Sequence, residues 1–208
     1  MRPCFLTLEG IDFSGKSTQC RHIIRCFEER GLPHVLVREP GGTPLSEAIR
    51  ALLLDATRED MSPVSELFLF SAARAQLVRD RIRPALAKGI SVIADRFFDS
   101  TTAYQGYGRG LDLDAIFRMH ALATEGLEPH LTLCYDVTWE VSQARRRARG
   151  GTLDRMEAGD REFFERVRKG YLALSERFPE RFVVIDGCSD EATVTLRTVA
   201  LLETRCFR

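Results

Sequence analysis

The chain has 208 residues, of which 44% are hydrophobic, and its 30 acidic side chains balance its 30 basic ones. This length is enough for one full hydrophobic core, so we expect a single domain over residues 1–208. A net charge of zero excludes the uniform positive field of a protein that coats nucleic acid, but it allows a small anionic ligand in a local pocket. We therefore expect no nucleic-acid partner.

The cysteines and the apolar runs bear on the location of the protein. The cysteines are scattered without a C-x-x-C pair, and the N-terminus does not resemble a signal peptide. This pattern favours free thiols in a reducing cytoplasm. No apolar run approaches the ~20 residues that a membrane span requires, so we expect no membrane association. The cysteines are Cys4, Cys20, Cys26, Cys134, Cys188 and Cys206.

A glycine-rich loop lies near the N-terminus, between the apolar run 4–8 and a helix-forming segment over 19–30. The stretch 10–18 has the spacing of a P-loop, in which backbone N–H groups and a helix N-terminus hold phosphates. Lys16 would then reach the β- and γ-phosphates, and the Ser17 hydroxyl would bind Mg²⁺. The predicted ATP-binding residues are Gly10, Ile11, Asp12, Phe13, Ser14, Gly15, Lys16, Ser17 and Thr18.

Strands and helices alternate after this loop. The apolar run 34–37 is too short for a helix and predicts a strand, and the turn-rich segment 38–42 follows its carboxyl end, where ligands bind in open α/β sheets. Thr43 and Ser62 each precede a proline, a pattern that predicts two helix N-termini. The second of these helices is long and apolar, and we expect an interruption or kink at Pro84.

Residues 90–95 predict a central strand that ends in an acid, followed by Arg96 and a polar loop that runs to Gly110. This is the Walker-B pattern, in which the acid orients Mg²⁺ or its waters. We therefore predict Asp95, together with Ser17, as the residues at the metal.

The rest of the chain continues the alternation. Strands that alternate with helices from end to end predict an α/β fold of three layers, with a five-stranded parallel sheet flanked by helices. The remaining predicted helices span 112–125, 138–147, 162–178 and 191–204, and the remaining strands span 131–136 and 182–186.

A P-loop alone leaves GTPases, ATPases and kinases of small molecules open. The chain has neither an N-K-x-D tetrapeptide nor a D-x-x-G sequence after the second strand, which argues against a GTPase. An ordered set of motifs narrows the choice, and over essentially its whole length the chain resembles the bacterial thymidylate kinases, which are P-loop nucleoside monophosphate kinases. The motifs are Glu9-Gly10 with Gly15-Lys16-Ser17, Arg38 to Thr43, Leu69 to Arg74, Asp95-Arg96-Phe97, Ser100 to Gly106, and Leu153 to Glu157.

The resemblance implies which residues surround the thymine base and the sugar. Phe70 matches the aromatic residue that stacks on the base, and Arg74 matches the arginine that bonds a base carbonyl. Thr101, Tyr104 and Gln105 match residues around the base and sugar, with Tyr104 crowding the ribose 2′ position. By pattern alone, Phe70 is equally an ordinary core aromatic, and residues 101–105 are a generic polar loop.

The resemblance also implies an acceptor-phosphate site. Arg50 and Arg96 match arginines that grip the dTMP phosphate, for which the planar guanidinium is well suited. Glu39 belongs to the acceptor loop, and Asp12 matches the acid near the sugar 3′-hydroxyl. The predicted dTMP-binding residues are Glu39, Arg50, Phe70, Arg74, Arg96, Thr101, Tyr104 and Gln105.

A dense basic cluster covers residues 145–149, and most of its arginines are expected to form a solvated helix end. The resemblance implies instead a short basic lid, about 145–157, whose arginine neutralises the moving phosphoryl group. One group of thymidylate kinases carries this arginine in the P-loop, at the position of Phe13, whereas the bacterial-like group has a glycine there more often and an arginine in the lid. The predicted catalytic residues are Lys16, Asp12, Arg96, Arg147, Arg149 and Arg155, with Arg145 as a further lid candidate.

The implied reaction transfers the γ-phosphoryl group of ATP to dTMP, with Mg²⁺, to give dTDP and ADP for dTTP synthesis. No general base is required, because the acceptor phosphate oxygen is already ionised at neutral pH. Family members are usually homodimers, which implies a second copy of this chain as partner. The alternatives are another nucleoside or deoxynucleoside monophosphate kinase, and a catalytically silent regulatory protein that binds nucleotides.

Overall fold

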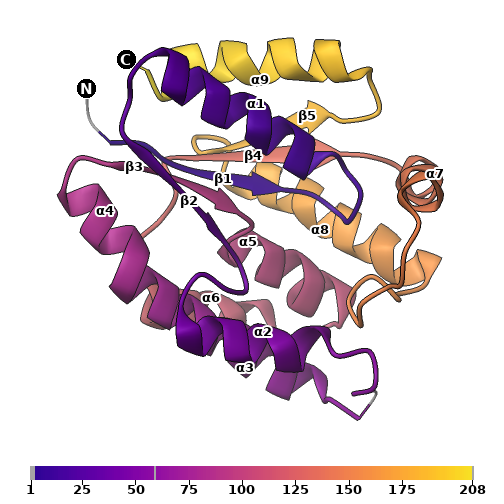
Figure 1. The fold of residues 1–208 in the computed structure, drawn as a ribbon. Coiled ribbons are helices and arrows are strands. Elements are labelled where there is room, and N and C mark those ends of the chain that lie inside the picture. The colour runs from indigo at the N-terminus through magenta and orange to yellow at the C-terminus, as the bar shows by residue number, and fades with distance from the viewer. Residues whose placement is uncertain (1–2, 59, 208) are drawn as a thin grey trace.

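The computed structural model describes residues 3–58 and 60–207, which form a three-layer α/β fold (Figure 1). The middle layer of these residues is a five-stranded parallel sheet, as the sequence predicted, and its strand order is β2-β3-β1-β4-β5. The strands are β1 (Phe5–Glu9), β2 (His34–Arg38), β3 (Ser91–Asp95), β4 (Leu131–Asp136) and β5 (Phe182–Asp186).

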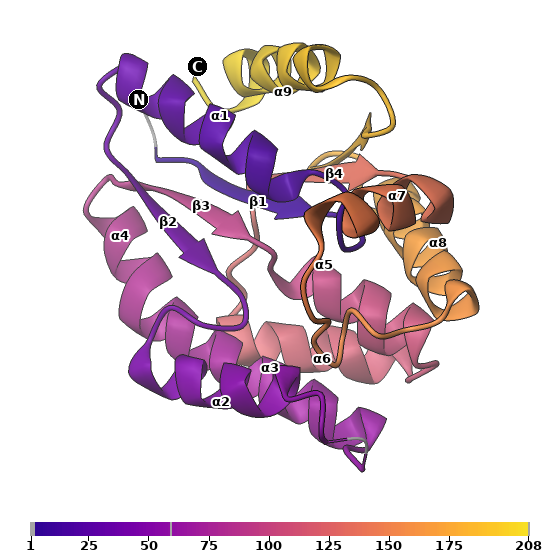
Figure 2. The same cartoon turned by 45° about the vertical axis from the view of Figure 1, so that its right-hand side comes forward.

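Helices cover both faces of the sheet. In Figures 1 and 2, α1 and α9 lie above the sheet, most other helices lie below it, and α7 stands at the carboxyl ends of the strands. The α-helices are α1 (Lys16–Glu29), α2 (Pro44–Leu54), α3 (Pro63–Leu77), α4 (Arg83–Ala87), α5 (Phe98–Thr101), α6 (Leu113–Thr124), α7 (Trp139–Arg149), α8 (Arg161–Arg177) and α9 (Glu191–Arg205). Two π-helical segments, η1 (Val78–Ile82) and η2 (Thr102–Gly108), complete the set.

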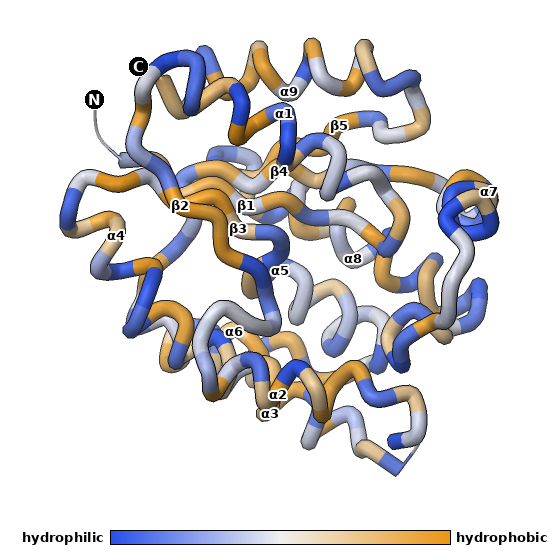
Figure 3. The backbone as a smooth tube through the Cα atoms, in the orientation of Figure 1, coloured by the Kyte–Doolittle hydropathy of each residue, from blue (hydrophilic) through white to orange (hydrophobic). Residues whose placement is uncertain are grey.

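The central strand β1 is buried along its whole length. Leu6 pairs with Ile93 of β3 on one side and with Leu131 of β4 on the other. Figure 3 shows the strands as mainly hydrophobic and α7 as mainly hydrophilic. Because a parallel sheet is covered on both faces, its strands are continuous apolar runs, whereas α7 packs at the edge of the fold and keeps its charges.

Two helices begin as the sequence predicted. The Thr43 hydroxyl accepts a hydrogen bond from the Ser46 N–H at 3.1 Å, and the Ser62 hydroxyl accepts one from the Ser65 N–H at the same distance. Each cap satisfies a backbone donor that the first helical turn leaves open, and the proline that follows has no N–H to satisfy. The caps fix where α2 and α3 start.

The long helix is interrupted before Pro84 rather than at it. Its regular part ends at Leu77, η1 follows over Val78–Ile82, and α4 resumes at Arg83. Proline lacks an N–H and its ring crowds the carbonyl four residues before it. The effect of Pro84 therefore falls on the preceding turn, which widens to a π-helix, rather than on the proline itself.

The polar loop predicted from Arg96 to Gly110 is wrong. The structure forms α5 and η2 over most of this stretch, and α8 packs closely against η2. A Cβ on Gly170 of α8 would meet the Tyr107 ring at 2.8 Å, so glycine permits this approach. The polar side chains of the segment are buried and bonded to partners far along the chain, and such pairs leave no local pattern in the sequence.

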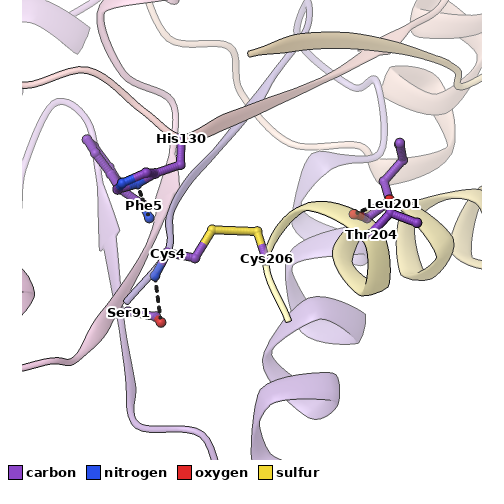
Figure 4. The surroundings of a disulfide bond; sticks show 7 residues. All are labelled: Cys4, Phe5, Ser91, His130, Leu201, Thr204 and Cys206. Carbon is purple, nitrogen blue, oxygen red and sulfur yellow. Dashed lines mark hydrogen bonds between the residues drawn. A yellow bond between two sulfur atoms is a disulfide. The ribbon is translucent and has the colours of Figure 1, made fainter. Parts of the chain in front are cut away.

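The prediction of free thiols is wrong for two of the six cysteines. Cys4 and Cys206 form a disulfide, with their Cα atoms 5.6 Å apart (Figure 4). The bond joins the start of β1 to the end of α9, across a sequence separation of 202 residues. Only the fold brings these ends together, so sequence spacing carried no signal for the pair. Within the described part of the chain, no helix is both long enough and apolar enough to cross a membrane.

Candidate active site

A cavity of about 520 Å³ opens at the carboxyl edge of the sheet. It brings together most of the residues that the sequence predicted for ATP, dTMP and metal, whereas Gly10, Ile11, Arg147 and Arg155 lie outside its lining. The predicted residues that line it are Asp12, Phe13, Ser14, Gly15, Lys16, Ser17, Thr18, Glu39, Arg50, Phe70, Arg74, Asp95, Arg96, Thr101, Tyr104, Gln105, Arg145 and Arg149.

The P-loop curls tightly between β1 and α1. Gly10 has a φ of 132°, and a Cβ at this position would lie 2.5 Å from the Tyr135 carbonyl oxygen, so no other residue fits. Gly15 is the N-cap of α1 and has no side chain to occupy the first N–H groups of the helix. These donors and the positive end of the helix dipole form an anion site.

Lys16 is folded back onto the loop. Its ammonium group donates to the Gly10 carbonyl oxygen at 3.0 Å and to the Ile11 carbonyl oxygen at 2.8 Å. Burial, and then the neighbouring Arg96 cation, lower the pKa of Lys16 to about 8. A group held in this way gains charge readily when an anion arrives, because the anion offsets both causes.

Arg96 is the centre of a polar network directly after β3. Its backbone has a φ of 70°, and its guanidinium donates to Asp12 Oδ1 at 2.6 Å and to the Gly10 carbonyl oxygen at 2.9 Å. The hydroxyls of Ser100 and Tyr104 also accept from it, at 3.0 and 3.2 Å. The cation is thereby fixed in the cavity wall beside the P-loop.

Asp12 is held from two sides. The Tyr104 hydroxyl donates to its Oδ2 at 2.8 Å, and Arg96 occupies its Oδ1. Burial opposes the ionisation of Asp12, but the Arg96 and Lys16 cations and the Tyr104 hydroxyl outweigh it, so the pKa of Asp12 lies below its usual value. The carboxylate is therefore ionised and connects the P-loop to η2.

Glu9 lies beneath this network, and the sequence analysis assigned it no role in the site. It accepts from the Phe97 N–H at 2.7 Å, from the Tyr171 hydroxyl at 3.0 Å and from Ser100. Burial, and then the Asp99 carboxylate, raise the pKa of Glu9 to about 7. An acid at the end of an otherwise apolar strand was the available signal, since such a residue is rarely buried without partners.

The predicted base pocket contains a buried ion pair. Arg74 Nη2 lies 2.7 Å from Glu39 Oε2 and donates to the Thr101 hydroxyl at 2.9 Å. Burial raises the pKa of Glu39, and the Arg74 cation offsets part of that rise. Within residues 3–58 and 60–207, Arg74 Nη1 and Glu39 Oε1 are buried without a hydrogen-bond partner. Phe70 lies in the same cavity wall.

Glu66 links the pocket to the lid, and the sequence analysis did not identify it. Its Oε1 accepts from Gln105 at 2.7 Å, and its Oε2 lies 2.6 Å from Arg155 Nη1. Arg155 also donates to the Leu53 carbonyl oxygen at 2.8 Å. Arg155 is thus bound to both α2 and α3. Its catalytic role stays a prediction.

Two further arginines lie near the loop after β2. Arg50 is half-buried and donates to the Pro40 carbonyl oxygen at 2.8 Å. Burial, and then the adjacent Arg38 cation, lower the pKa of Arg50. Arg38 lines the cavity as well, and the sequence analysis named it only as part of a motif. Two cations that line the same cavity favour an anionic ligand there.

The lid helix α7 lies against the P-loop (Figure 2). The Ser142 hydroxyl donates to the Asp12 carbonyl oxygen at 2.9 Å, and Arg145 Nη1 donates to the Ser14 carbonyl oxygen at 3.0 Å. Arg145 and Arg149 line the cavity, whereas Arg147 is exposed outside it. The structure therefore places two of the basic residues at the phosphate-binding loop.

The fit of the site to Mg²⁺ follows from its oxygen donors. Ser17 and Asp95 both line the cavity. Among the described residues, no group of three or more His, Cys, Asp or Glu side chains is arranged to hold a metal by itself. At nucleotide sites, proteins bind Mg²⁺ through one or two oxygen ligands of their own, and phosphate oxygens and waters complete the coordination. The oxygens of Ser17 and Asp95 fit this pattern.

Comparisons with known proteins give the same family over most of the chain. The family model for thymidylate kinase matches residues 8–195. A thymidylate kinase of Geotalea daltonii is 46% identical over 206 residues, covering 95% of this chain and 96% of the relative. One from Desulfosudis oleivorans is 48% identical over 205 residues, covering 96% of each chain.

A solved structure agrees with these sequence matches. The crystal structure of thymidylate kinase from Ehrlichia chaffeensis has a TM-score of 0.78 at 35% identity, covering 97% of this chain and 99% of that one. The comparisons confirm the predicted fold and resemblance, and they do not favour another kinase or a catalytically silent protein. The chain belongs to the thymidylate kinase family.

Proposed function

We propose that the protein transfers the γ-phosphoryl group of ATP to dTMP, giving dTDP and ADP. The observation that carries this proposal is one cavity in which a P-loop adjoins a pocket walled by Phe70 and Arg74, in a chain of the thymidylate kinase family. A donor phosphate site and a base pocket in one cavity suit direct transfer between two nucleotides.

The donor site uses the P-loop backbone and Lys16. The N–H groups at the start of α1 bind the ATP phosphates, and Lys16 turns from its carbonyl partners to the phosphate oxygens. Ser17 and Asp95 would hold Mg²⁺ or its waters, and the ion supplies positive charge on the phosphate oxygens when it is bound. The negative charge that develops on the β-phosphate of the leaving ADP is thus met by the loop N–H groups and by Lys16.

The acceptor site uses Arg96 and Arg50. Arg96 is fixed by Asp12 and by the carbonyl oxygen of Gly10, so it holds the dTMP phosphate at the mouth of the P-loop. Arg50, close to Arg38, binds the same phosphate from the other side. The attacking oxygen is ionised at neutral pH, and alignment rather than proton removal is what the protein supplies.

The base pocket favours thymine through its spare donor. Arg74 Nη1 has no partner in the described chain, and a base carbonyl supplies the acceptor that it lacks. Cytosine presents an amino donor where thymine has a carbonyl, so two donors would face each other. Tyr104, held by Asp12, closes the space beside the sugar and disfavours a 2′-hydroxyl.

We also propose that the protein works as a homodimer in the cytoplasm, where its nucleotide substrates are found. Exposed apolar side chains are concentrated on α2, α3 and α6, where α3 packs against both neighbours. A second copy would cover this surface. The side chains are Leu45, Leu52, Val64, Phe68 and Leu122.

A panel of acceptors tests the function. The wild-type protein, with ATP and Mg²⁺, is offered dTMP, dUMP, dCMP, AMP and thymidine, and ADP release is measured. We expect dTMP to give the highest kcat/KM and thymidine to give no product, because the site is built for an acceptor phosphate. Lys16→Ala should fold yet lose turnover. A higher rate with AMP or dCMP, or full activity of Lys16→Ala, would contradict the proposal.

A further inference from the structure

One face of α7 runs along the P-loop. Ser142, Arg145 and Arg149 are spaced three and four residues apart, so they share that face. The first two donate to the carbonyl oxygens of Asp12 and Ser14. The third lies over the residue between them, with the guanidinium carbon of Arg149 4.6 Å from the centre of the Phe13 ring. Three successive contacts therefore fit the lid helix to three successive P-loop residues.

Phe13 occupies an unusual backbone conformation. Its φ is 61°, in the left-handed region that a bulky side chain rarely adopts and that glycine enters freely. Strain of this kind persists where the surrounding structure over-determines it, often at functional sites. The ring is only half-buried, so burial in the core does not explain its presence. The contact of the ring with Arg149 accounts for an aromatic residue at this position.

The hydrogen-bonding edge of Arg149 is bound to a carboxylate that an anionic ligand can replace. The guanidinium carbon lies over the ring, as in a cation–π contact, and this contact uses none of the N–H groups of Arg149. The edge points at Glu157, with Nη1 and Nη2 each 3.2 Å from a carboxylate oxygen. A carboxylate and a phosphate offer the same bidentate oxygen geometry to that edge. A phosphoryl oxygen pair can thus replace Glu157 while the ring still holds the arginine.

We propose that Phe13 is a positioning residue, whose ring holds the lid arginine Arg149 over the P-loop so that it meets the transferring phosphoryl group. The proposal rests on the proposed function. The ring of Phe13 thereby keeps a cation from the lid beside the donor-phosphate loop.

Substitutions at Phe13 test the proposal in steady-state kinetics with ATP and dTMP. Phe13→Leu keeps an apolar side chain in the same backbone but removes the π face, and Phe13→Gly also relieves the backbone. Both should lower kcat about 2- to 5-fold, the range that one exposed cation–π contact supports, with the KM for dTMP unchanged. Phe13→Trp should retain the wild-type kcat. Phe13→Gly should unfold at a temperature no lower than the wild type.

The control and the coupling test separate this role from a structural one. Glu125 has a φ of 51° at the end of α6, so Glu125→Gly relieves similar strain outside the cavity and should leave kcat unchanged. In an Arg149→Ala background, Phe13→Leu should lower kcat no further. A wild-type kcat in Phe13→Leu, or an equal further loss in that background, would overturn the proposal while leaving the proposed function intact. A wild-type protein that phosphorylates no nucleotide would overturn both.

Discussion

The protonation state of Lys16 depends on its surroundings in the cavity. Its ammonium group is bound to two carbonyl oxygens, and its pKa is lowered to about 8 by burial and by Arg96. The bound triphosphate brings several negative charges to within contact distance, which favours the protonated form. Binding of ATP and protonation of Lys16 are therefore coupled.

This coupling predicts proton uptake when ATP binds near pH 8. About half of the Lys16 side chains are neutral at that pH, so each ATP bound should draw in about half a proton. Calorimetric titrations at pH 8 in two buffers of different ionisation enthalpy measure the uptake. Lys16→Met is the control and should show none. An apparent binding enthalpy that is the same in both buffers would contradict the prediction.

The raised pKa of Glu9 predicts that the stability of the fold also depends on pH. Its pKa of about 7 in the fold lies above the ordinary value of 4.5, so the folded protein binds more protons than the unfolded chain between these values. The free energy of unfolding therefore falls as pH rises through that window, by up to about 3 kcal/mol for this group. Glu9→Gln, which keeps an acceptor for the Phe97 N–H, should flatten the fall.

Urea unfolding at pH 5 and at pH 8 compares the two proteins. The wild type should lose more stability between these pH values than Glu9→Gln loses. Equal losses in the two proteins would show that Glu9 titrates at its ordinary pKa.

Residue types at the ligand-facing positions were predictable because their chemistry is matched to the ligand. A P-loop lysine, paired arginines and an acid after a strand each have a motif or a family match. The residues beneath them were not predictable, because Glu9 and Glu66 act through partners that lie far away in sequence. The place of Glu9 at the end of an apolar strand hinted at burial, but the partners of both residues are supplied only by the fold.

At the scale of elements, Glu66 of α3 joins the pocket to the lid. It is almost fully buried and accepts from Gln105 of η2, from Arg109 and from Arg155 at the base of the lid segment. Removing one partner of a buried ion pair leaves the other charge uncompensated. The position of the lid thus depends on a residue outside it.

Glu66→Ala should lower the free energy of unfolding by about 3 to 5 kcal/mol, since it leaves Arg155 buried and unpaired. Chemical denaturation measures the loss, and Glu66→Ala with Arg155→Ala should recover part of it. The matched control is Glu165→Ala, which breaks the exposed pair between Arg161 and Glu165 and should change stability little. Comparable losses at Glu66 and Glu165 would argue that the buried pair is not a structural link.

Elements with strong apolar periodicity were predicted well, and the polar helix was not. The five strands and the capped helices follow from local sequence, because their burial and their turn residues are local. Residues 98–108 contain Thr, Tyr and Gln side chains that resemble a loop until Arg74, Glu66 and Asp12 satisfy them. Tertiary hydrogen bonds, which no local sequence pattern shows, determine that residues 98–108 are helical.

At the scale of the whole molecule, the apolar side chains on α2, α3 and α6 predict assembly. Phe68 is 58% exposed on α3, and a glutamate there would place a charge in the proposed dimer interface. Phe68→Glu should be a monomer at concentrations where the wild type is a dimer, as light scattering after gel filtration measures. Leu196→Glu changes an even more exposed leucine on α9 and should stay dimeric. A wild type that is itself monomeric would overturn the proposed assembly.

The disulfide between Cys4 and Cys206 also bears on the order in which the elements follow one another along the chain. These two cysteines lie near the two ends of the described chain, and their Cα atoms are 5.6 Å apart. A short linker between them would close the chain into a ring, and new ends could be opened at the exposed turn of Lys88 and Gly89. Such a circular permutant keeps every strand and the whole phosphate-binding loop uncut. The cavity depends on the spatial arrangement of these elements. It does not depend on β1 being the first of them along the chain.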